Sequence, residues 1–261
     1  MTYVISDLHG YDLERFKALL KIADFGEDDF LYILGDVIDR NGDGGVAMLQ
    51  WLMYQPNIQM LLGNHEAALL SCAFLFDEVT EESIAAVSNE TMALLTEWQM
   101  NGGDITIKAL GELNKTAPDT VLDILDFLRD LPLYERVSAG GREFLLVHAG
   151  LGGFRPERPL ADYTADELIW HRPTIDERYF EDVYTIFGHT PTATFGKEYE
   201  GEILFTDTWA CIDCGVNFGA DPILLRLDDM QQFRITEDEF IDMVTQDVLK
   251  RYLPAFKELA K

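Results

Sequence analysis

The feature that most constrains this chain is a charged loop that directly follows a short apolar run. Phe30–Leu34 is apolar and too short for a helix, which predicts a buried strand. The segment GDVIDR comes next and brings Asp36, Asp39 and Arg40 to the point where that strand should end. Charged groups are costly to bury unless they are paired or bind a metal. Because ligands in open α/β sheets bind where strands end, this loop predicts a ligand site.

The N-terminal part repeats this order of strand, polar loop and helix. Strands are expected at Thr2–Ser6, Phe30–Leu34 and Ile58–Leu62, with helices after the first two. The repeat predicts parallel strands joined by right-handed crossovers. Two further strands are expected at 143–147 and 183–187. The runs 203–205, 210–212 and 223–227 suggest a second, largely antiparallel sheet.

Between the third and fourth strands lies a long acidic segment with helical character. We interpret residues 67–131 as an inserted helical cap, because strand patterns resume directly after it. The whole chain, residues 1–261, is therefore expected to form a single domain. The sequence TEDE, from Thr236 on, predicts a C-terminal helix of about residues 236–253.

The charge balance limits the partners that such a chain can take. Twenty Lys and Arg residues stand against 47 Asp and Glu residues, giving a formal net charge of -27. So acidic a chain is unsuited to nucleic acid or to an anionic membrane, since both are bound through Lys and Arg. No apolar run approaches the ~20 residues of a membrane helix, and the N-terminus enters a strand at once. A cytoplasmic protein is the expectation.

Histidines concentrate where strands are expected to end. The chain has five, and four of them lie at such positions: His9, His65, His148 and His189. Imidazoles mixed with carboxylate and amide oxygens suit Mn, Fe or Zn. Six candidate ligands exceed the three that a lone catalytic zinc uses, which favours two metal ions ~3.5–4 Å apart; these candidates are Asp7, His9, Asp36, Asn64, His148 and His189. Arg40 and Arg172 could clamp phosphate oxygens.

Five motifs occur in order along the chain: DLHG (7–10), GDVIDR (35–40), GNHE (63–66), VHAG (147–150) and GHTP (188–191). With these motifs the sequence resembles the calcineurin-like metallophosphoesterases, in particular the bacterial and phage branch of the phosphoprotein (Ser/Thr) phosphatase family. The resemblance extends to about residue 227. It implies an α/β (α+β) fold: a β-sandwich of two mixed sheets flanked by helices, a four-layer αββα arrangement, with an inserted helical cap.

The resemblance also implies roles for individual residues. One metal ion would be held by Asp7, His9 and a bridging Asp36, and the second by Asp36, Asn64, His148 and His189. A hydroxide held by both ions would attack phosphorus in line. His65 would protonate the leaving group, with Asp39 orienting its ring. The phosphoryl oxygens would be bound by Arg40, Asn64, His65 and Arg172. The identity of the metals, Mn, Fe or Zn, stays open.

Simpler interpretations compete with some of these roles. Asp39 could pair with Arg40 alone, and Glu66 reads as a helix first-turn residue favoured by the helix dipole. Two positions depart from the family pattern. Asn41 follows Arg40 where Gly is usual, and Asn is the best replacement if that position needs a positive φ. Ser6 precedes the first Asp, where Gly is common.

These features predict a metal-dependent phosphoester hydrolase. The leading expectation is a Ser/Thr protein phosphatase-like phosphomonoesterase, whose substrate would be a phosphoprotein or a small phosphoester. The alternative is a bis(nucleosyl)-tetraphosphatase-type pyrophosphohydrolase, which would share the same ligands. A non-catalytic binding module that retains the fold is the third possibility, although the full set of ligands would be superfluous in one.

Overall fold

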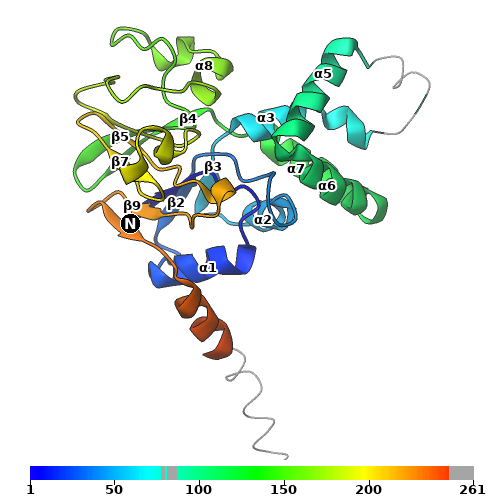
Figure 1. The fold of residues 1–261 in the computed structure, drawn as a ribbon, viewed down its shortest axis with the longest axis horizontal. Coiled ribbons are helices and arrows are strands. Elements are labelled where there is room, and N and C mark those ends of the chain that lie inside the picture. Colours follow the sequence, from blue (N-terminus) through cyan, green and yellow to red (C-terminus); the bar gives the residue numbers. More distant parts are fainter. Residues whose placement is uncertain (78–79, 81–86, 247–261) are drawn as a thin grey trace, which may run out of the picture.

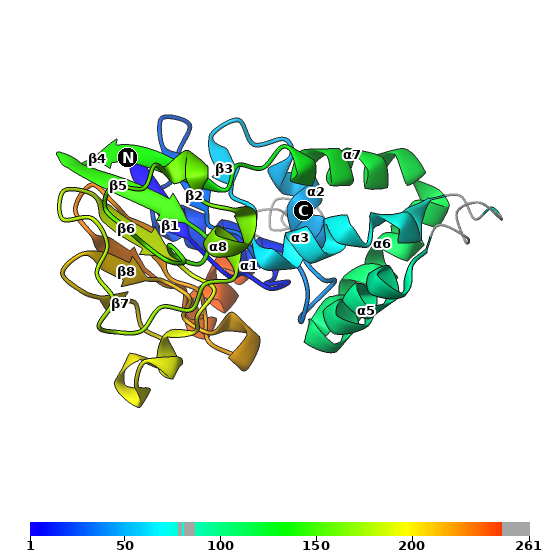
Figure 2. The ribbon, with the colours of Figure 1, turned by 90° about the horizontal axis from the view of Figure 1, so that it is seen from above.

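Two five-stranded sheets pack face to face in this computed structural model, which describes residues 1–77, 80 and 87–246 (Figure 1, Figure 2). The first sheet has the strand order β10-β9-β1-β2-β3 and the second the order β4-β5-β6-β8-β7. Helices flank the pair of sheets, so the expected sandwich of two mixed sheets is confirmed.

The first sheet is built mainly from the N-terminal repeat. Its strands are β1 (Thr2–Ile5), β2 (Phe30–Ile33), β3 (Ile58–Met60), β9 (Leu224–Arg226) and β10 (Gln231–Phe233). The pairs β1–β2 and β2–β3 are parallel, as the repeat predicts. β9 was expected in the second sheet, and that assignment is wrong: Leu225 pairs antiparallel with Val4 on the free edge of β1.

The second sheet is mixed. Its strands are β4 (Tyr134–Ala139), β5 (Arg142–Val147), β6 (Tyr184–Phe187), β7 (Leu204–Phe205) and β8 (Trp209–Cys211). The pairs β5–β6 and β6–β8 are parallel, whereas β4–β5 and β7–β8 are antiparallel. The expectation of a largely antiparallel sheet is wrong because long crossovers, not hairpins, join β5 to β6 and β6 to β8.

Alternating side chains define the layers of the sandwich. Val4 of β1 points between the sheets, into a core cluster that also holds Phe144 and Ile186. Its neighbours Tyr3 and Ile5 point the other way, toward a second cluster. There the sheet is covered by α1 (Leu13–Ile22) and α2 (Val46–Leu52). The outer face of the second sheet is covered by α8 (Ala165–Ile169) and short 3₁₀ turns.

The short 3₁₀ turns are brief connectors between the main elements. They are η1 (Ala73–Phe76), η3 (Leu160–Asp162), η4 (Thr192–Thr194), η5 (Lys197–Tyr199) and η6 (Val216–Phe218).

The acidic segment between β3 and β4 is helical, and its helices extend away from the sandwich (Figure 2). The first of these helices, α3 (Asn64–Ser71), begins with the GNHE motif. We call the following residues 73–129 the cap; it contains α5 (Asn89–Trp98), the π-turn η2 (Gln99–Gly103), α6 (Asp104–Thr116) and α7 (Pro118–Arg129). Gly102, with φ 101°, makes the break between α5 and α6. Apolar side chains of α6 and α7 join the core cluster of α1 and α2.

A helix begins after Thr236, as predicted, and is described through residue 246. Thr236 and Glu239 cap it reciprocally: the Glu239 N–H donates to Thr236 Oγ1 at 3.3 Å, and the Thr236 N–H donates to Glu239 Oε2 at 2.9 Å. The remainder of the expected range, 247–253, lies outside the described residues. Within the described part of the chain, every helix is too short or too polar to cross a membrane.

Candidate metal centre

The polar loops that follow β1, β2 and β6 meet at one edge of the sandwich. Six residues in these loops have a positive φ although none is glycine: Asp7, His9, Asp36, Asp39, Arg40 and His189. This region of backbone space is costly for residues with a Cβ and is concentrated at functional sites. Backbone hydrogen bonds hold the first two loops together, with the His9 N–H donating to the Asp36 carbonyl at 2.9 Å.

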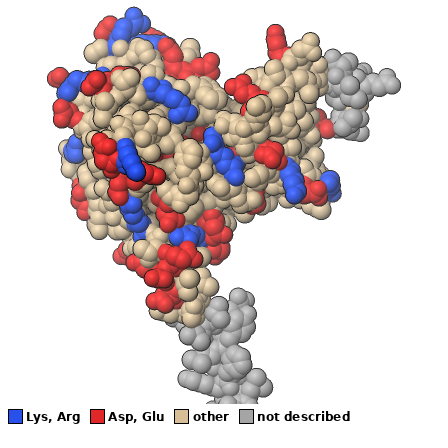
Figure 3. Space-filling model, in the orientation of Figure 1, with Lys and Arg blue, Asp and Glu red and all other residues tan. Residues whose placement is uncertain are grey.

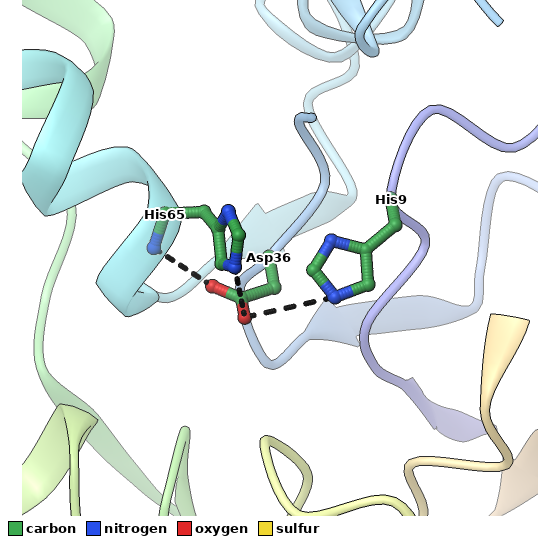
Figure 4. A group of neighbouring side chains, drawn as sticks. All are labelled: His9, Asp36 and His65. Atoms are coloured by element: carbon green, nitrogen blue, oxygen red, sulfur yellow. Dashed lines mark hydrogen bonds and ion pairs between the residues drawn. The ribbon is translucent and has the colours of Figure 1, made fainter. Parts of the chain in front are cut away.

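Asp36 lies between two imidazoles in the first of two groups of possible metal ligands (Figure 4). Nε2 of His9 and Nε2 of His65 are each 3.9 Å from Asp36 Oδ2. His9 Nδ1 lies 3.1 Å from the Ile38 carbonyl oxygen, which fixes the tautomer and leaves Nε2 free to act as a ligand. Burial lowers the pKa of His9 to about 3, so the ring is neutral, the form that binds metal.

The second group consists of Asp36, His148 and His189. Nδ1 of His148 donates to the Leu34 carbonyl at 2.7 Å, and its Nε2 lies 3.4 Å from Asp36 Oδ1 and 3.0 Å from Asn64 Oδ1. Burial alone would lower the pKa of His148, but the Asp36 carboxylate outweighs it and raises this pKa to about 9. The carboxylate and amide oxygens beside Nε2 thus favour a positive charge at this position.

The residues present fit two divalent ions that share Asp36. Nε2 of His189 is buried and has no hydrogen-bond partner among the described residues. A buried nitrogen of this kind needs a partner, and a metal ion would supply one. Burial, with the nearby His148, lowers the pKa of His189 to about 2, which keeps that nitrogen unprotonated. Imidazole, carboxylate and amide together form the mixed donor set that suits Mn, Fe or Zn.

Asp7 lies beside these two groups and is not a member of either, as far as the described residues show. Its carboxylate accepts from the His189 backbone N–H at 3.1 and 2.9 Å and from the Ser6 hydroxyl. Burial, and then the Asp213 carboxylate, raise the pKa of Asp7 well above its usual range. Repulsion from the Asp36 carboxylate adds to this rise in pKa, and a cation bound near both carboxylates would offset it.

Asp39 and His65 form a buried pair. His65 Nδ1 lies 2.5 Å from Asp39 Oδ2, and Asp39 is fully buried. Two cap residues donate to the same carboxylate: Trp98 Nε1 to Oδ2 at 2.7 Å and Thr106 Oγ1 to Oδ1 at 2.5 Å. Among the described residues, the side chains that contact the Asp39 carboxylate are therefore His65, Trp98 and Thr106, and the Arg40 guanidinium is not one of them.

The two arginines expected to bind phosphate lie at the same cavity, which has a volume of about 260 Å³ and is also lined by His9, Asp36, His65 and His189. Nη2 of Arg40 donates to Asn101 Oδ1 at 2.8 Å and lies 3.1 Å from His65 Nε2. Nη1 of Arg172 donates to the His189 carbonyl at 3.0 Å. Seven of the ten predicted site residues thus line one cavity. The other three, Asp7, Asp39 and His148, do not line it, but each contacts a residue that does.

Glu66 has a larger part than the sequence suggests. Its fully buried carboxylate accepts from the backbone N–H groups of Asp36 and Val37 at 2.9 Å each, of Ile38 at 3.3 Å and of Gly63 at 3.2 Å. Burial, followed by the repulsion of Asp36, raises the pKa of Glu66 to about 7. Glu66 thus fastens the loop after β2 to the start of α3, beyond the helix first-turn position expected for it.

The two departures from the family pattern have plain structural outcomes. Asn41 does not take the positive φ that was considered for it; Asp39 and Arg40 take it instead, so the turn is made one residue earlier. The Asn41 side chain donates to the His9 carbonyl at 3.0 Å and so links two of the loops. Ser6, through its hydroxyl, supports the Asp7 carboxylate.

The model of the calcineurin-like phosphoesterase family matches residues 2–208, and the chain belongs to this family. Among curated relatives, it is similar to the symmetrical bis(5'-nucleosyl)-tetraphosphatase of Acidovorax sp. (strain JS42), with 27% identity over 64% of this chain and 47% of the relative. The enzyme of the same name from Paracidovorax citrulli is 24% identical over 80% of this chain and 62% of the relative. The chain spans about half the length of the curated relatives it matches.

Solved structures share the fold. A candidate diadenosine tetraphosphatase superposes with a TM-score of 0.58 at 19% identity, covering 90% of this chain and 92% of the other. A protein serine/threonine phosphatase from Saccharomyces cerevisiae gives a TM-score of 0.52 at 14% identity, with 90% and 80% covered. At such identities these likenesses show the fold alone.

Proposed function

We propose that this chain is a metal-dependent hydrolase that cleaves bis(5'-nucleosyl) tetraphosphates at the central phosphoanhydride bond. The observation that carries the hydrolase chemistry is that Asp36 belongs to both groups of possible metal ligands. The nucleotide substrate is proposed from the names of the curated relatives. Residues 1–261 would act as one domain, since cap and sandwich share a core cluster.

The two groups of possible ligands support His9, Asp36, His148 and His189 as metal ligands. Asp7, which lies beside them, and Asn64, whose Oδ1 is 3.0 Å from His148 Nε2, are added from the family resemblance. Two divalent ions, when bound, supply electrophilic activation of the phosphoryl group and of the attacking water. Asp36 would contact both ions. The first would also be held by Asp7 and His9, and the second by Asn64, His148 and His189. Nδ1 of His148, bonded to the Leu34 carbonyl, keeps Nε2 turned toward the metal position.

His65 would serve as the general acid. Burial disfavours its charged form, but the Asp36 and Asp39 carboxylates outweigh burial, and its pKa is raised. The proton on Nδ1 is held by Asp39, so Nε2 would deliver a second proton to the leaving oxygen. Water would add to one central phosphorus, the bridging P–O bond would break, and the departing nucleoside diphosphate would take the proton from His65.

Arg40 would prepare this step by moving. A guanidinium can only donate, so Arg40 beside Nε2 requires an unprotonated nitrogen on His65. A phosphate group bound in the cavity would attract Arg40 and free Nε2 to carry a proton. Arg172, which also lines the cavity, would hold the phosphoryl oxygens and stabilise their charge in the transition state.

Ser/Thr phosphoprotein phosphatase activity, the leading expectation from sequence, has less support. The likeness to the yeast phosphatase concerns the fold, whereas the curated relatives in question are named for a dinucleotide substrate. A substrate panel with Mn²⁺ tests the choice: diadenosine tetraphosphate, a phosphoserine peptide and p-nitrophenyl phosphate. We expect kcat/KM for the dinucleotide to exceed that for the peptide at least ~10-fold, or about 1.4 kcal/mol. Preferential cleavage of the peptide would overturn the proposed substrate.

A further inference from the structure

A second cavity adjoins the metal centre on the side of the cap. It has a volume of about 260 Å³ and lies between α3, α5 and α8. One water occupies ~30 Å³ of liquid volume. The cavity is several times larger than that, so it has room for a bicyclic ring. In the space-filling view, a notch separates the sandwich, which carries α8, from the cap, which carries α5 (Figure 3).

The walls of this cavity are mostly apolar, and two of the large side chains are unusually exposed. Leu94 on α5 is 49% exposed and Trp170, at the end of α8, is 44% exposed. Leu62, Ala68 and Ile169 complete the apolar wall. Large apolar groups that line a concave surface and stay open to solvent mark a binding site for an apolar or aromatic group.

The two cavities differ in the described charged residues that line them, because only the metal cavity has arginines beside its carboxylates, Asp36 and Asp213. Both arginines of the site, Arg40 and Arg172, line the metal cavity. The described residues that line the second cavity include the carboxylates Glu97 and Asp166 but no Lys or Arg. Phosphate groups would be repelled there and retained beside the arginines. The second cavity therefore favours an uncharged end of the same substrate.

The two cavities share part of their lining, and the proposed general acid lies where they adjoin. Asn64, His65, Asn101 and Trp170 line both. A general acid must lie within hydrogen-bond reach of the leaving oxygen. The departing nucleoside diphosphate would therefore lie beside His65. Its phosphates would lie where the two cavities adjoin, and its nucleoside would extend toward the cap.

We propose that the cavity between α3, α5 and α8 binds the nucleoside of the departing nucleoside diphosphate, with the base against Trp170 and Leu94. This inference rests on the proposed function, because a dinucleotide substrate supplies the uncharged ring. Bases stack on aromatic side chains with little preference for sequence, so the cavity would select for a nucleoside without requiring one particular base.

The test fills the cavity from an exposed position. Ala165, the first residue of α8, lines the cavity and is exposed, so Ala165→Trp adds bulk there without disturbing the core. The matched control is Ala161→Trp in η3, also exposed and outside the lining. With Mn²⁺ enzyme we expect Ala165→Trp to lower kcat/KM for diadenosine tetraphosphate at least ~10-fold. Its inhibition constant for ADP should rise similarly, while that for inorganic pyrophosphate stays unchanged.

A second pair of variants removes contact instead of adding bulk. Leu94→Ala should weaken inhibition by ADP about threefold to tenfold, since apolar contact with the ring is lost. Met92→Ala is its control, on the same helix and 48% exposed. Equal ADP inhibition of Ala165→Trp and Ala161→Trp, in an enzyme that cleaves the dinucleotide, would overturn the cavity assignment alone. A wild-type protein that cleaves only the phosphopeptide would overturn the proposed function and the nucleoside assignment with it.

Discussion

The loops at the strand ends and the cap meet at the same cavity but are built differently. In the loops, residues such as Asp36 and His189 adopt positive φ and are almost fully buried, and backbone hydrogen bonds link one loop to the next. The cap contributes from regular helices. Trp98 ends α5 and Thr106 lies in the first turn of α6, so ordinary helical geometry aims their side chains at Asp39.

This difference separates two tasks. Loops with strained backbone that are hydrogen-bonded to one another can hold several metal-binding side chains at fixed positions, and metal-ion catalysis requires such fixed positions. Helices of the cap instead hydrogen-bond to Asp39 and line a neighbouring cavity. The sequence of the cap can therefore vary without the loss of a metal ligand. Changes in the loops should therefore abolish hydrolysis of every substrate, whereas changes in the cap should reduce it or alter its selectivity.

The largest effect is expected at the shared carboxylate. Asp36→Asn removes the negative charge common to both groups of ligands, so it should lose metal and at least ~10³-fold in kcat for all substrates. Metal analysis after gel filtration and assays with diadenosine tetraphosphate and p-nitrophenyl phosphate measure this. The control is Asp43→Asn, an exposed carboxylate just beyond the same loop that caps α2. Full metal occupancy in Asp36→Asn would refute the shared-ligand role.

His65→Asn should separate catalysis from metal binding. Loss of the proposed general acid should lower kcat by ~10²–10⁴-fold while metal content stays near that of the wild type. Steady-state kinetics and metal analysis on the same preparation measure both quantities. Activity like that of the wild type would contradict the acid role, and loss of metal would make His65 a ligand instead, as its place in the first group would allow.

The cap should act on catalysis through Asp39. Thr106→Val removes one donor from that carboxylate, so kcat should fall about tenfold to 100-fold with KM and metal content unchanged. Thr116→Val is the control, because Thr116 lies on the same helix, is exposed and donates its hydroxyl proton to the Leu113 carbonyl of its own helix. A change in KM without a change in kcat would instead indicate that Thr106 acts in substrate binding, which would contradict the proposal that the cap acts on catalysis through Asp39.

The smallest effect concerns the helix that faces the cap. The hydrogen bond from Arg158, and then that from the Thr164 backbone, lower the pKa of Glu167 to about 2. Its folded pKa lies below the unfolded value near ~4.5, so the stabilisation is present above that pH and is lost as pH falls toward 2. Glu167→Gln should thus lower Tm slightly at pH 7, and the gap to the wild type should close with acidification. The exposed Glu157→Gln serves as control; a gap that is constant with pH would contradict the assignment.

The site residues in the loops could be predicted from the sequence because the pattern that marks them is local. A short apolar run followed by Asp or His recurs at each strand end, and parallel strands bring such ends to one edge. Trp98 and Thr106 could not be linked to Asp39 in this way, because they lie 59 and 67 residues away and meet it only through the path of the cap. Glu66, the last residue of GNHE, was interpreted from the sequence as a helix first-turn residue, and its four backbone partners could not be predicted.

The same limit applies to the sheets. The strand pattern at 223–227 was recognisable, but its partner was not, because β1 and β9 are more than 200 residues apart and either sheet offers a compatible apolar edge. Which strand pairs with which is decided by packing between the two sheets, and the period-2 pattern carries no information on that choice.

The most direct test of the account is the fate of water oxygen during cleavage of diadenosine tetraphosphate by the Mn²⁺-loaded protein. In ¹⁸O-labelled water, direct attack at a central phosphorus predicts ADP as the only nucleotide product, with one ¹⁸O on the terminal phosphate of one of the two ADP molecules. Formation of ATP and AMP, or no turnover of the dinucleotide, would contradict the proposed reaction.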